Sequence, residues 1–456
     1  MEKKGKTGVN EVRGESGKAG LLYQVSDKPK MTTSILLGFQ NILTAFSGIV
    51  AVPLIIAGIA GLDVVETAYL ISASLLASGI ASIIQSRGFG PKKFRVGVGL
   101  PTVMGTDFGF VPPANSIINT MGGGMAGYFG ASILGAVLEF IFSFFVKPLM
   151  KVFTPVVTGT VIALMGMSMM PVAFDWVGGG VGNPNYGDPK YIMIAAIVFL
   201  TILLLNRYTK GLVNSAAVMI GIVVGYFICI PFGLINFGEI ASAKWLQLPE
   251  IAHFGIDFNP KYVIPFIAGY LVTVIETVGV METLGEVTGT KLSSDDVVAG
   301  VRGDAVSSFV CPFVGSGPAQ TFGQNVGLIP LTKCASQFVA VVTGVLLILM
   351  SLFPKLSTVV SIMPSCVLGG AGILMFGTVA VSGIKTLSRV KFTNRNLLII
   401  ASSIGIGLGV TFRPDVVAHL PGILSSLFSS GISAGTIVAL VLSLILKDDP
   451  DAEEVD

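Results

Sequence analysis

Charged residues are scarce in this chain: Asp, Glu, Lys and Arg together make up only 12% of its 456 residues. Hydrophobic residues make up 52%, and the mean hydropathy is +0.83. No ordinary water-soluble domain shows this balance. Apolar runs of about 20 residues, the length that crosses a bilayer as a helix, recur between residues 35 and 446 with short polar breaks. The sequence therefore predicts an all-α polytopic membrane protein with about fourteen transmembrane segments, several of them short or broken.

Histidine and cysteine are also rare. The two histidines, His253 and His419, fall in connections between apolar runs, so neither is placed to carry protons through a membrane. The four cysteines lie inside or beside apolar runs and show no C-x-x-C spacing. We expect them to be small buried side chains rather than disulfides or metal ligands. They are Cys229, Cys311, Cys334 and Cys366. We expect no metal site and no cofactor.

Several classes of function lack their sequence signatures. A primary pump needs a nucleotide site, but the nearest match, GESGKAG from Gly14, lacks the spacing and the Ser/Thr of a phosphate loop. An intramembrane aspartyl protease needs paired aspartates with Gly-x-Gly-Asp, which Arg302-Gly303-Asp304 does not supply. A channel would more naturally show a continuous pore with rings of like groups. We therefore expect neither an enzyme nor a nucleic-acid-binding protein, and secondary transport is the best remaining class.

The positive residues are unevenly distributed. If the N-terminus is cytoplasmic and about fourteen segments alternate across the bilayer, most Lys and Arg residues fall in the inward connections, as the positive-inside rule requires. The inward set is Arg87, Lys92, Lys93, Arg95, Lys147, Lys151, Arg207, Lys210, Lys291, Arg302, Lys333, Lys385, Arg389, Lys391 and Arg395. The outward set is Lys190, Lys244, Lys261, Lys355 and Arg413. This distribution predicts a multi-pass protein of the cytoplasmic (inner or plasma) membrane with both termini in the cytoplasm.

A frame of glycine and proline occurs twice. Residues 105–112 and 323–330 share the pattern G-x-x-x-G-x-x-P, and Pro101 and Pro318 precede the two copies. Each copy lies in an apolar stretch too interrupted for a full spanning helix. The alternative is that the frame arose by chance, or from a duplication with no surviving role, since glycine and proline are frequent in membrane helices. However, paired broken segments in corresponding positions mark the binding site of transporters built from inverted repeats. We therefore expect a 7+7 inverted repeat, with short extended stretches in the broken third and tenth segments.

This organisation divides the chain into five regions. Residues 1–33 are expected to form a polar cytoplasmic tail, residues 34–240 the first repeat, and residues 241–260 an extracytoplasmic connection. Residues 261–446 are expected to form the second repeat and residues 447–456 a cytoplasmic tail.

The second copy of the frame carries groups suited to a flat heterocycle. The side-chain amide of Gln324 offers a donor and an acceptor, so it can pair with two atoms of a ring edge. Gly323 and Gly327 allow a flat ligand to approach the backbone closely, and a half-helix beginning near Gly327 presents free N–H groups. Phe108 and Phe110 of the first copy are candidate stacking partners.

Several acidic residues lie in apolar surroundings. Glu276 lies well inside an apolar run that begins near Val263, where an unpaired charge costs several kcal/mol. It is the strongest functional candidate, although satisfaction by neighbouring helices is possible. Asp304 begins the next run, where an ion pair with Arg302 or a helix-capping contact is open. Asp107 is interpreted as a turn former, and both a packing role and a partner role remain open for Glu139. If transport is coupled to protons, a carboxylate such as Glu276 must carry them.

The run Gln324-Asn325-Val-Gly327-Leu-Ile-Pro-Leu-Thr332-Lys333 resembles the signature of the nucleobase-ascorbate transporter family, Q/E-N-x-G-x(4)-T-K/R/G. The resemblance extends over most of the chain: GFQNILTAFSGIVAVPLI from Gly38 is similar to the family's first helix and LPTVMGTDFGF to its third. The region around Glu276 and Asp304 resembles the xanthine and uric acid permease branch. Uracil permeases usually have Glu at the position of Gln324.

The resemblance implies a homodimer in which each subunit has a core domain (segments 1–4 and 8–11) and a gate domain (segments 5–7 and 12–14). It implies elevator-like import of a purine by H⁺ symport, with Na⁺ as the other candidate ion. Glu276 would bind the purine and take part in proton coupling, and Gln324 would pair with the purine ring. Asn325 would support the tenth segment, Asp304 would be the ninth-helix aspartate, and Thr106 would influence substrate affinity.

Two positions depart from the family pattern. Gln40 is followed by Asn41 where the family usually has His, and Gly323 stands where Ala or Ser is common. Both positions fall close to the expected pocket, so the preferred purine stays open. The alternatives are a symporter of uracil or another nucleobase, an anion carrier of the related sulfate or bicarbonate type, and, more distantly, a gated channel.

Overall fold

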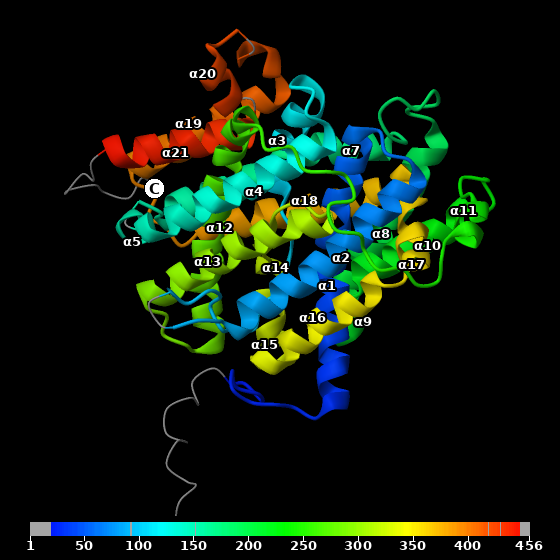
Figure 1. The fold of residues 1–456 in the computed structure, drawn as a ribbon, viewed down its shortest axis with the longest axis horizontal. Helices are drawn as coiled ribbons and strands as arrows, with labels where there is room; N and C mark the ends of the chain where they lie inside the picture. Colours follow the sequence, from blue (N-terminus) through cyan, green and yellow to red (C-terminus); the bar gives the residue numbers. More distant parts are fainter. Residues whose placement is uncertain (1–19, 92–93, 151, 418, 429, 447–456) are drawn as a thin grey trace, which may run out of the picture.

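The computed structural model describes residues 20–91, 94–150, 152–417, 419–428 and 430–446. The expected tails at residues 1–19 and 447–456, and the expected inward charges Lys92, Lys93 and Lys151, lie outside the described residues. Within the described part, nine stretches of helix have the length and apolar composition to cross a membrane (Figure 1). They are α1 (Met31–Ala60), α2 (Val64–Arg87), α4 (Gly124–Phe142) with η5 (Ser143–Phe145) and α5 (Val146–Leu149), α6 (Pro155–Ser168) with α7 (Met170–Val177), α8 (Pro189–Tyr208), η6 (Pro260–Tyr262) with α12 (Val263–Thr288), α13 (Ser294–Val310) with η7 (Cys311–Val314), α18 (Ser365–Leu387) and α19 (Asn394–Phe412).

Other spans are bent or short. The helices α16 (Gln337–Ser351) and α17 (Pro354–Ser361) meet at 81°, and α10 (Ala217–Cys229) and α21 (Gly431–Ile445) are shorter apolar helices. Full-length helices alone therefore do not reach the expected count of about fourteen. Among the described residues, the other candidates are the bent pair, the two short helices and the two broken segments. The remaining short elements are α9 (Gly211–Ser215), α11 (Phe237–Ser242), η8 (Pro414–Val417) and α20 (Gly422–Leu427).

Local sequence determines where the chain reverses between spans. Gly61 ends α1 with a φ of 64°, a left-handed conformation that glycine adopts without strain. Two residues later, the Asp63 carboxylate accepts a hydrogen bond from the Glu66 N–H at 2.8 Å and caps α2. The resulting turn is short, so α1 and α2 pack against each other as neighbours.

The two broken segments meet as a small antiparallel sheet. Strand β1 (Met104–Thr106) pairs with β2 (Ala319–Thr321), and Gly105 lies opposite Gln320. Short helices follow each strand: η3 (Phe108–Phe110), α3 (Val111–Asn115) and the π-helix η4 (Ser116–Thr120) after β1, and α14 (Gly323–Val326) and α15 (Leu328–Thr332) after β2. The extended stretches expected in the third and tenth segments are therefore present.

The repeated glycine-proline frame marks both broken segments, but its matching positions do not fall at equivalent points of the two structures. Gly105 lies in the middle of β1, whereas Gly323 is the first residue of α14. The matching glycines therefore occupy different elements. Both segments consist of a short strand followed by short helices, so the structural repeat is present. Aligning the two copies by their glycines and prolines does not pair structurally equivalent residues.

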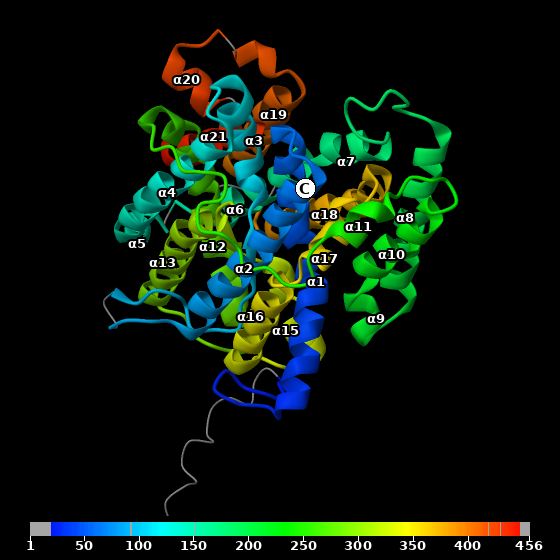
Figure 2. The same cartoon turned by 45° about the vertical axis from the view of Figure 1, so that its right-hand side comes forward.

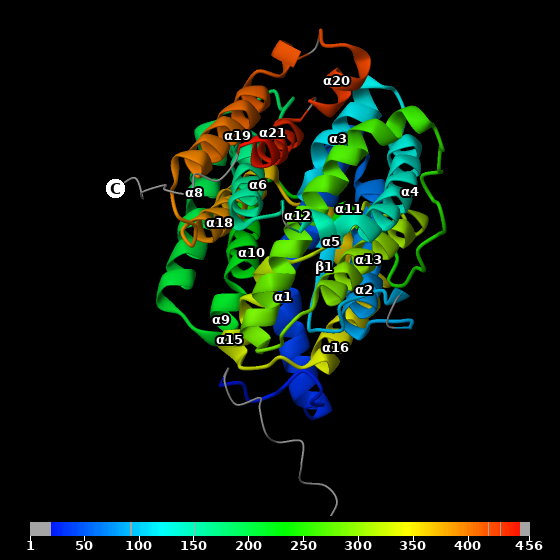
Figure 3. The ribbon, with the colours of Figure 1, turned by 90° about the vertical axis from the view of Figure 1, so that its left-hand side faces the viewer.

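The helices form two groups, a core and a gate. The core group contains α1, α2, α4, α12, α13 and α16 around the sheet, and the gate group contains α6, α7, α8, α10, α18, α19 and α21. In Figure 3, α8, α10, α18 and α19 lie on the left and α2, α4, α13 and α16 on the right; Figure 2 shows α8 and α10 away from α4 and α13. Each group includes helices from both halves of the chain, because α2 packs against α16 and α6 packs against α18.

Residues near the start of the described chain differ from the expectation of a solvated tail. The Leu22 N–H donates to the Lys333 carbonyl at 2.8 Å, the Ala335 N–H donates to the Tyr23 carbonyl at 2.8 Å, and the Gln337 N–H donates to the Val25 carbonyl at 3.0 Å. The reason is the apolar sequence Leu-Leu-Tyr-Gln-Val within an otherwise polar stretch. Residues 21–25 are therefore anchored to the connection between α15 and α16.

Candidate functional site

Asp304 is a fully buried hub between core elements. Its Oδ1 accepts hydrogen bonds from Gln85 Nε2 on α2 and from Thr321 Oγ1 on β2, each at 2.9 Å. Its Oδ2 accepts a short hydrogen bond from the Thr277 hydroxyl on α12. Arg302, two residues earlier on α13, donates from Nε to Ser143 Oγ at the start of η5 at 3.1 Å. The sequence predicts an ion pair with Arg302 or a helix-capping contact for Asp304. The observed partners are instead one side-chain amide and two hydroxyls inside the core.

Glu276 lies on α12 beside β2, where polar atoms of Glu276 and of its neighbour Gln320 have no hydrogen-bond partner among the described residues. The Gln320 side chain of β2 lies against the Glu276 carboxylate. Within the described residues, however, Glu276 Oε2 and Gln320 Nε2 are buried without a hydrogen-bond partner. Buried polar atoms of this kind are uncommon in folded proteins and call for a partner. The Glu276 carboxylate and the Gln320 amide, opposite Gly105 in the middle of the small sheet, therefore each carry one buried polar atom without a partner among the described residues.

Gln324 and Gly323 lie on the exposed side of α14, between α1 and α12. Gly48 of α1 makes room there: a Cβ at Gly48 would lie 2.9 Å from Phe322 Cζ and 3.1 Å from Gln324 Nε2. At Gly323, a Cβ would lie 3.3 Å from Val280 Cγ2 of α12. Close packing at glycine is therefore seen at Gly48 and at Gly323, and it brings three core elements around the Gln324 amide. The approach of a flat ligand to Gly323 and Gly327 stays a prediction.

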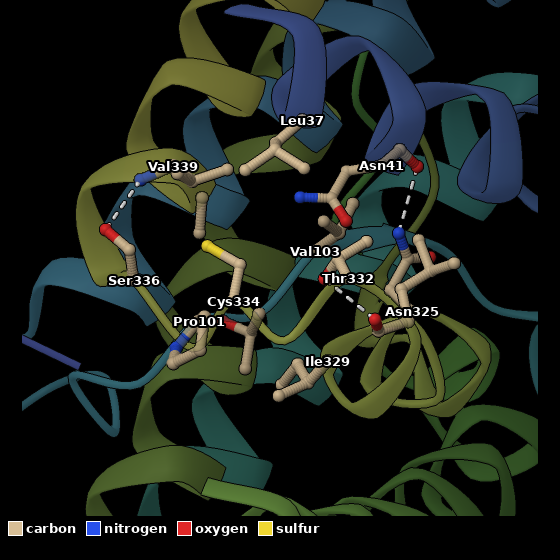
Figure 4. Close-up of a pocket in the computed structure, with 13 residues that line it drawn as sticks. Leu37, Asn41, Pro101, Val103, Asn325, Ile329, Thr332, Cys334, Ser336 and Val339 are labelled. Atoms are coloured by element: carbon tan, nitrogen blue, oxygen red, sulfur yellow. Dashed lines mark hydrogen bonds between the residues drawn. The ribbon is translucent and has the colours of Figure 1, made fainter. Parts of the chain in front are cut away.

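Asn325 points away from the Gln324 side of α14. Its Nδ2 donates to the main-chain oxygen of Asn41 at 2.9 Å (Figure 4), and Asn41 Nδ2 donates to Thr343 Oγ1 on α16 at 3.2 Å. The cavity drawn in Figure 4 has a volume of about 20 Å³, room for about one water molecule. Asn325 and Asn41 thus link α14, α1 and α16, and the space between them is too small for a purine.

Thr106 fixes β1 to α1. Its hydroxyl is buried and donates to the main-chain oxygens of Gly48 and Ile49 at 3.2 and 3.3 Å. The neighbouring Asp107 accepts from the Gly109 N–H at 2.7 Å, as expected for a turn former, and also from Thr273 Oγ1 of α12 at 2.6 Å. These contacts make both residues supports of the broken segment.

The two candidate stacking residues occupy different environments. Phe110 is 0% exposed, and its ring packs against Phe266 and Tyr270 of α12 with centroids 5.1 and 4.7 Å away. It belongs to the hydrophobic core, so the expectation that it stacks on a ligand is wrong for this conformation. Phe108 is partly exposed and meets Phe376 of α18 edge-on at 5.2 Å. It therefore lies where the core group contacts the gate group.

Three residues of the site were not predicted from the sequence. Gln320 and Phe322 flank the strand-helix junction, and their placement depends on the pairing of β1 with β2. Gln85 is different: it is a lone amide in the last turn of an apolar helix, a signal comparable to that of Glu276. Its Nε2 also bonds the Gly300 carbonyl at 3.0 Å, and its Oε1 accepts from the Val98 N–H at 3.2 Å.

A large cavity of about 850 Å³ separates the two groups at the end of the bundle where α1 ends. Its lining comes from α1, α3, α7, α18, α19 and α21 and includes Asn115, Asp175 and Trp176. Glu276 and Gln324 are not part of this lining. The cavity therefore lies between core and gate, apart from Glu276 and Gln324.

All four cysteines are buried and free, as expected of small apolar side chains. Over the described part of the chain, no three His, Cys, Asp or Glu side chains are grouped as metal ligands would be.

Comparison with known proteins agrees with this architecture. A model of the permease family matches residues 32–416. Over 436 residues the chain is 49% identical to a putative purine permease of Clostridium perfringens, covering 96% of this chain and 95% of that protein. It is 38% identical to the uric acid transporter of Escherichia coli, covering 91% and 86% of the two chains. It is 36% identical to the xanthine permease of Bacillus subtilis, covering 93% and 96%.

Solved structures share the fold at low sequence identity. The transmembrane domain of a cyanobacterial bicarbonate transporter superposes with a TM-score of 0.58 at 12% identity, covering 87% of this chain and 99% of that one. A murine anion transporter of solute carrier family 26, in its inward-facing state, gives a TM-score of 0.58 at 12% identity, covering 92% and 69%. These likenesses concern the fold alone. With the signature from Gln324 to Lys333 and relatives that match over most of its length, the chain is a multi-pass membrane protein that belongs to the nucleobase-ascorbate transporter family of permeases.

Proposed function

We propose that the chain imports a purine, xanthine or uric acid, across the cytoplasmic membrane by H⁺ symport. The observation that carries the proposal is the pair of unsatisfied polar atoms on the Gln320 amide of β2 and the Glu276 carboxylate beside it, near the exposed amide of Gln324. Xanthine and uric acid present N–H donors and C=O acceptors around one flat ring system. A carboxylate accepts from N–H groups, and amides pair with both kinds of edge atom. The names of the relatives, a uric acid transporter and a xanthine permease, support the same substrate class.

In this proposal each residue has a defined part. Glu276 accepts N–H groups of the purine, and Gln324 pairs with its other edge. Gly323 lets the ring approach the backbone of α14, and the partly exposed Phe108 lies where a ring could stack. Asn325, Asn41, Thr106 and Asp304 hold the surrounding elements in place through the hydrogen bonds described above.

The remaining features of the proposal concern orientation and motion. We propose that both termini face the cytoplasm, that residues 34–240 and 261–446 are the two inverted repeats, and that the core moves past the gate like an elevator. The contact of Phe108 with Phe376 lies at the boundary where such motion would occur. A homodimer would hold the gate fixed, and H⁺ is the proposed coupling ion, with Na⁺ as the alternative.

Counterflow in proteoliposomes tests the substrate. Vesicles loaded with unlabelled xanthine should accumulate labelled xanthine, and external xanthine or uric acid should inhibit more strongly than uracil. Gln324→Ala should raise the half-saturating concentration about 10- to 100-fold, because the lost hydrogen bonds are worth about 1–3 kcal/mol. Asn185→Ala, which removes an exposed amide between α7 and α8, is the matched control and should transport normally.

The same assay separates the alternatives. An anion carrier is favoured here only by the shared fold. Inhibition by bicarbonate or sulfate, with no effect of purines, would overturn the proposed substrate class. Unchanged affinity in Gln324→Ala would remove Gln324 from the site. Single-channel currents would indicate a gated channel instead of a carrier.

A further inference from the structure

One buried face of α4 carries polar side chains outside the proposed purine site. Tyr128, Ser132, Glu139 and Ser143 follow one another at spacings of one or two helical turns. Each is at most 2% exposed. They form a continuous stripe, which we call the α4 stripe, and it faces α12 and α13, the helices against which α4 packs (Figure 1). The Tyr270 hydroxyl of α12 confirms the facing, since it donates to the Ser132 carbonyl at 2.8 Å.

The α4 stripe is not satisfied by its neighbours. Within the described residues, the Tyr128 hydroxyl, the Ser132 hydroxyl and both carboxyl oxygens of Glu139 are buried without a hydrogen-bond partner. An ionised carboxylate in such a place would cost far more than a neutral acid. The surroundings of Glu139 therefore favour its neutral form. A helix that only packed against apolar neighbours would need no acidic side chain at this position.

One end of the α4 stripe leads to an exposed cluster of charges. Ser143 lies one turn beyond Glu139 and accepts from Arg302 Nε at 3.1 Å, and the Arg302 guanidinium lies 4.7 Å from the centre of the Phe144 ring. One turn further, Lys147 Nζ pairs with Asp295 Oδ1 at 2.5 Å, and both side chains are about half exposed. The α4 stripe thus connects a buried acid to the surface within two helical turns, past a fixed positive charge.

The other charged groups around Glu139 link it to the proposed site. Asp304 and Asp107 lie within electrostatic range of its carboxyl group, and Glu139 lies within range of the Tyr270 hydroxyl. Loss of a proton from one buried acid changes the cost of ionising the others, so their titrations are linked. The titratable and charged groups on the elements packed around the α4 stripe are Tyr128 on α4 itself, Tyr262 and Lys261 on η6, Tyr270, Glu276, Glu282 and Glu286 on α12, Asp295, Asp296, Arg302 and Asp304 on α13, Cys311 on η7, Lys147 on α5, and Asp107 before η3.

We propose that Glu139 is a second proton-carrying residue, separate from the purine pocket, which exchanges its proton with the solution along the α4 stripe past Ser143. On release, the O–H bond of the Glu139 carboxyl group breaks and the proton forms an O–H bond on a water molecule near Ser143. The electron pair stays on the carboxylate. In the proposed orientation the exit faces the cytoplasm. The role rests on the proposed H⁺ symport.

Two measurements on Glu139→Gln test the proposal, with Glu282→Gln on the exposed side of α12 as the matched control. The infrared spectrum of the wild-type protein at neutral pH should contain a protonated-carboxyl C=O band that Glu139→Gln loses and Glu282→Gln keeps. In proteoliposomes, Glu139→Gln should retain xanthine counterflow. Its uptake should become equal with and without an inward proton gradient, whereas the gradient should still increase uptake by Glu282→Gln.

The outcomes separate this proposal from the proposed function. If the gradient does not drive wild-type uptake, H⁺ symport is wrong, and the proton-carrying role of Glu139 falls with it. If it drives wild type and Glu139→Gln equally, only the role of Glu139 is wrong, whether or not the band is present. If Glu139→Gln does not insert, Ser143→Ala takes its place: it keeps the acid and should slow gradient-driven uptake while sparing counterflow. Wild-type rates in Ser143→Ala would then overturn the route.

Discussion

The side-chain amide of Asn325 donates to the main-chain oxygen of Asn41 at 2.9 Å, although the two residues are 284 positions apart. The second amide of the signature therefore joins α14 to α1, while the first, Gln324, stays on the exposed side of α14. Adjacent residues with the same functional group thus have different tasks. Asn325 sets the position of the half-helix, and Gln324 is left to meet a ligand.

Asn325→Ala should lower stability more than it lowers purine affinity. The change removes the side-chain donor to the half-buried Asn41 carbonyl of α1, at a cost of about 0.5–1.5 kcal/mol, the net contribution of one hydrogen bond. The matched change Asn41→Ala keeps that oxygen and removes only the bond to Thr343, so it should cost less. Thermal unfolding of the purified protein and xanthine binding measure the two effects. Equal losses of stability in both variants would show that the Asn325–Asn41 bond is not the important contact.

Gly48→Ala should disturb the pocket through Phe322. A Cβ at Gly48 would lie 2.9 Å from the Phe322 ring, closer than the usual carbon contact of about 3.5–4.0 Å. The ring has little room to retreat, because it also packs on Gly105, where a Cβ would lie 2.4 Å from it. Overpacking of this kind costs about 1–3 kcal/mol, and the nearby Gln324 amide should shift with the ring. We expect weaker xanthine binding.

Gly58→Ala is the control for this change. Gly58 lies on the same helix, and its Cβ would meet no atom within 4 Å. Replacing glycine by alanine at an unstrained helical position stabilises a protein by about 0.4–1 kcal/mol. Gly58→Ala should therefore unfold at the same or a higher temperature and bind xanthine normally. If both variants bind alike, Gly48 is not needed for the shape of the pocket.

Some residues of this site can be predicted from the sequence and others cannot, and the difference has a physical reason. Glu276 and Gln324 can be recognised because an acid inside an apolar run and an amide between glycines are unusual wherever the chain folds. Gln320 and Phe322 acquire their positions from the β1–β2 pairing, a contact between segments far apart in the chain. The repeated glycine-proline frame predicts that the two broken segments meet, but the hydrogen bonds between β1 and β2 determine which residues face each other.

The environment of single residues is equally hard to read from spacing. Phe108 and Phe110 are two positions apart and look equivalent in the sequence, yet one lies at the gate and the other in the core. Asp304 and Arg302 look like an ion pair, yet they point to different helices. Residues two apart on a helix do not share a face, and this separates both pairs.

Asp304→Asn should destabilise the core. Asp304 accepts from Gln85, Thr321 and Thr277, whereas an asparagine side chain has only one acceptor oxygen. At least one donor then faces an amide N–H₂ group, at a cost of about 1–3 kcal/mol. Thermal unfolding should show the loss, and Asp415→Asn, at an exposed aspartate of η8, should not show it.

A double-mutant cycle identifies the partner. Thr277→Val removes the donor to Oδ2, so the double variant should lose less stability than the sum of the two single changes. Additive losses would mean that Thr277 does not share an interaction with Asp304.

Glu276→Gln should separate purine binding from proton-driven accumulation. Glutamine has the shape of a protonated glutamate and cannot ionise, so it holds the site permanently in the neutral form. We expect the variant to bind xanthine and to exchange it across the membrane at equilibrium. It should no longer concentrate xanthine when the outside is acidic. The measurement is uptake by vesicles with and without an imposed pH gradient, with Glu282→Gln as the control. Gradient-driven accumulation equal to that of the wild type would contradict the assignment, because coupling would then have to depend on Asp304, Glu139 or Na⁺ and not on Glu276.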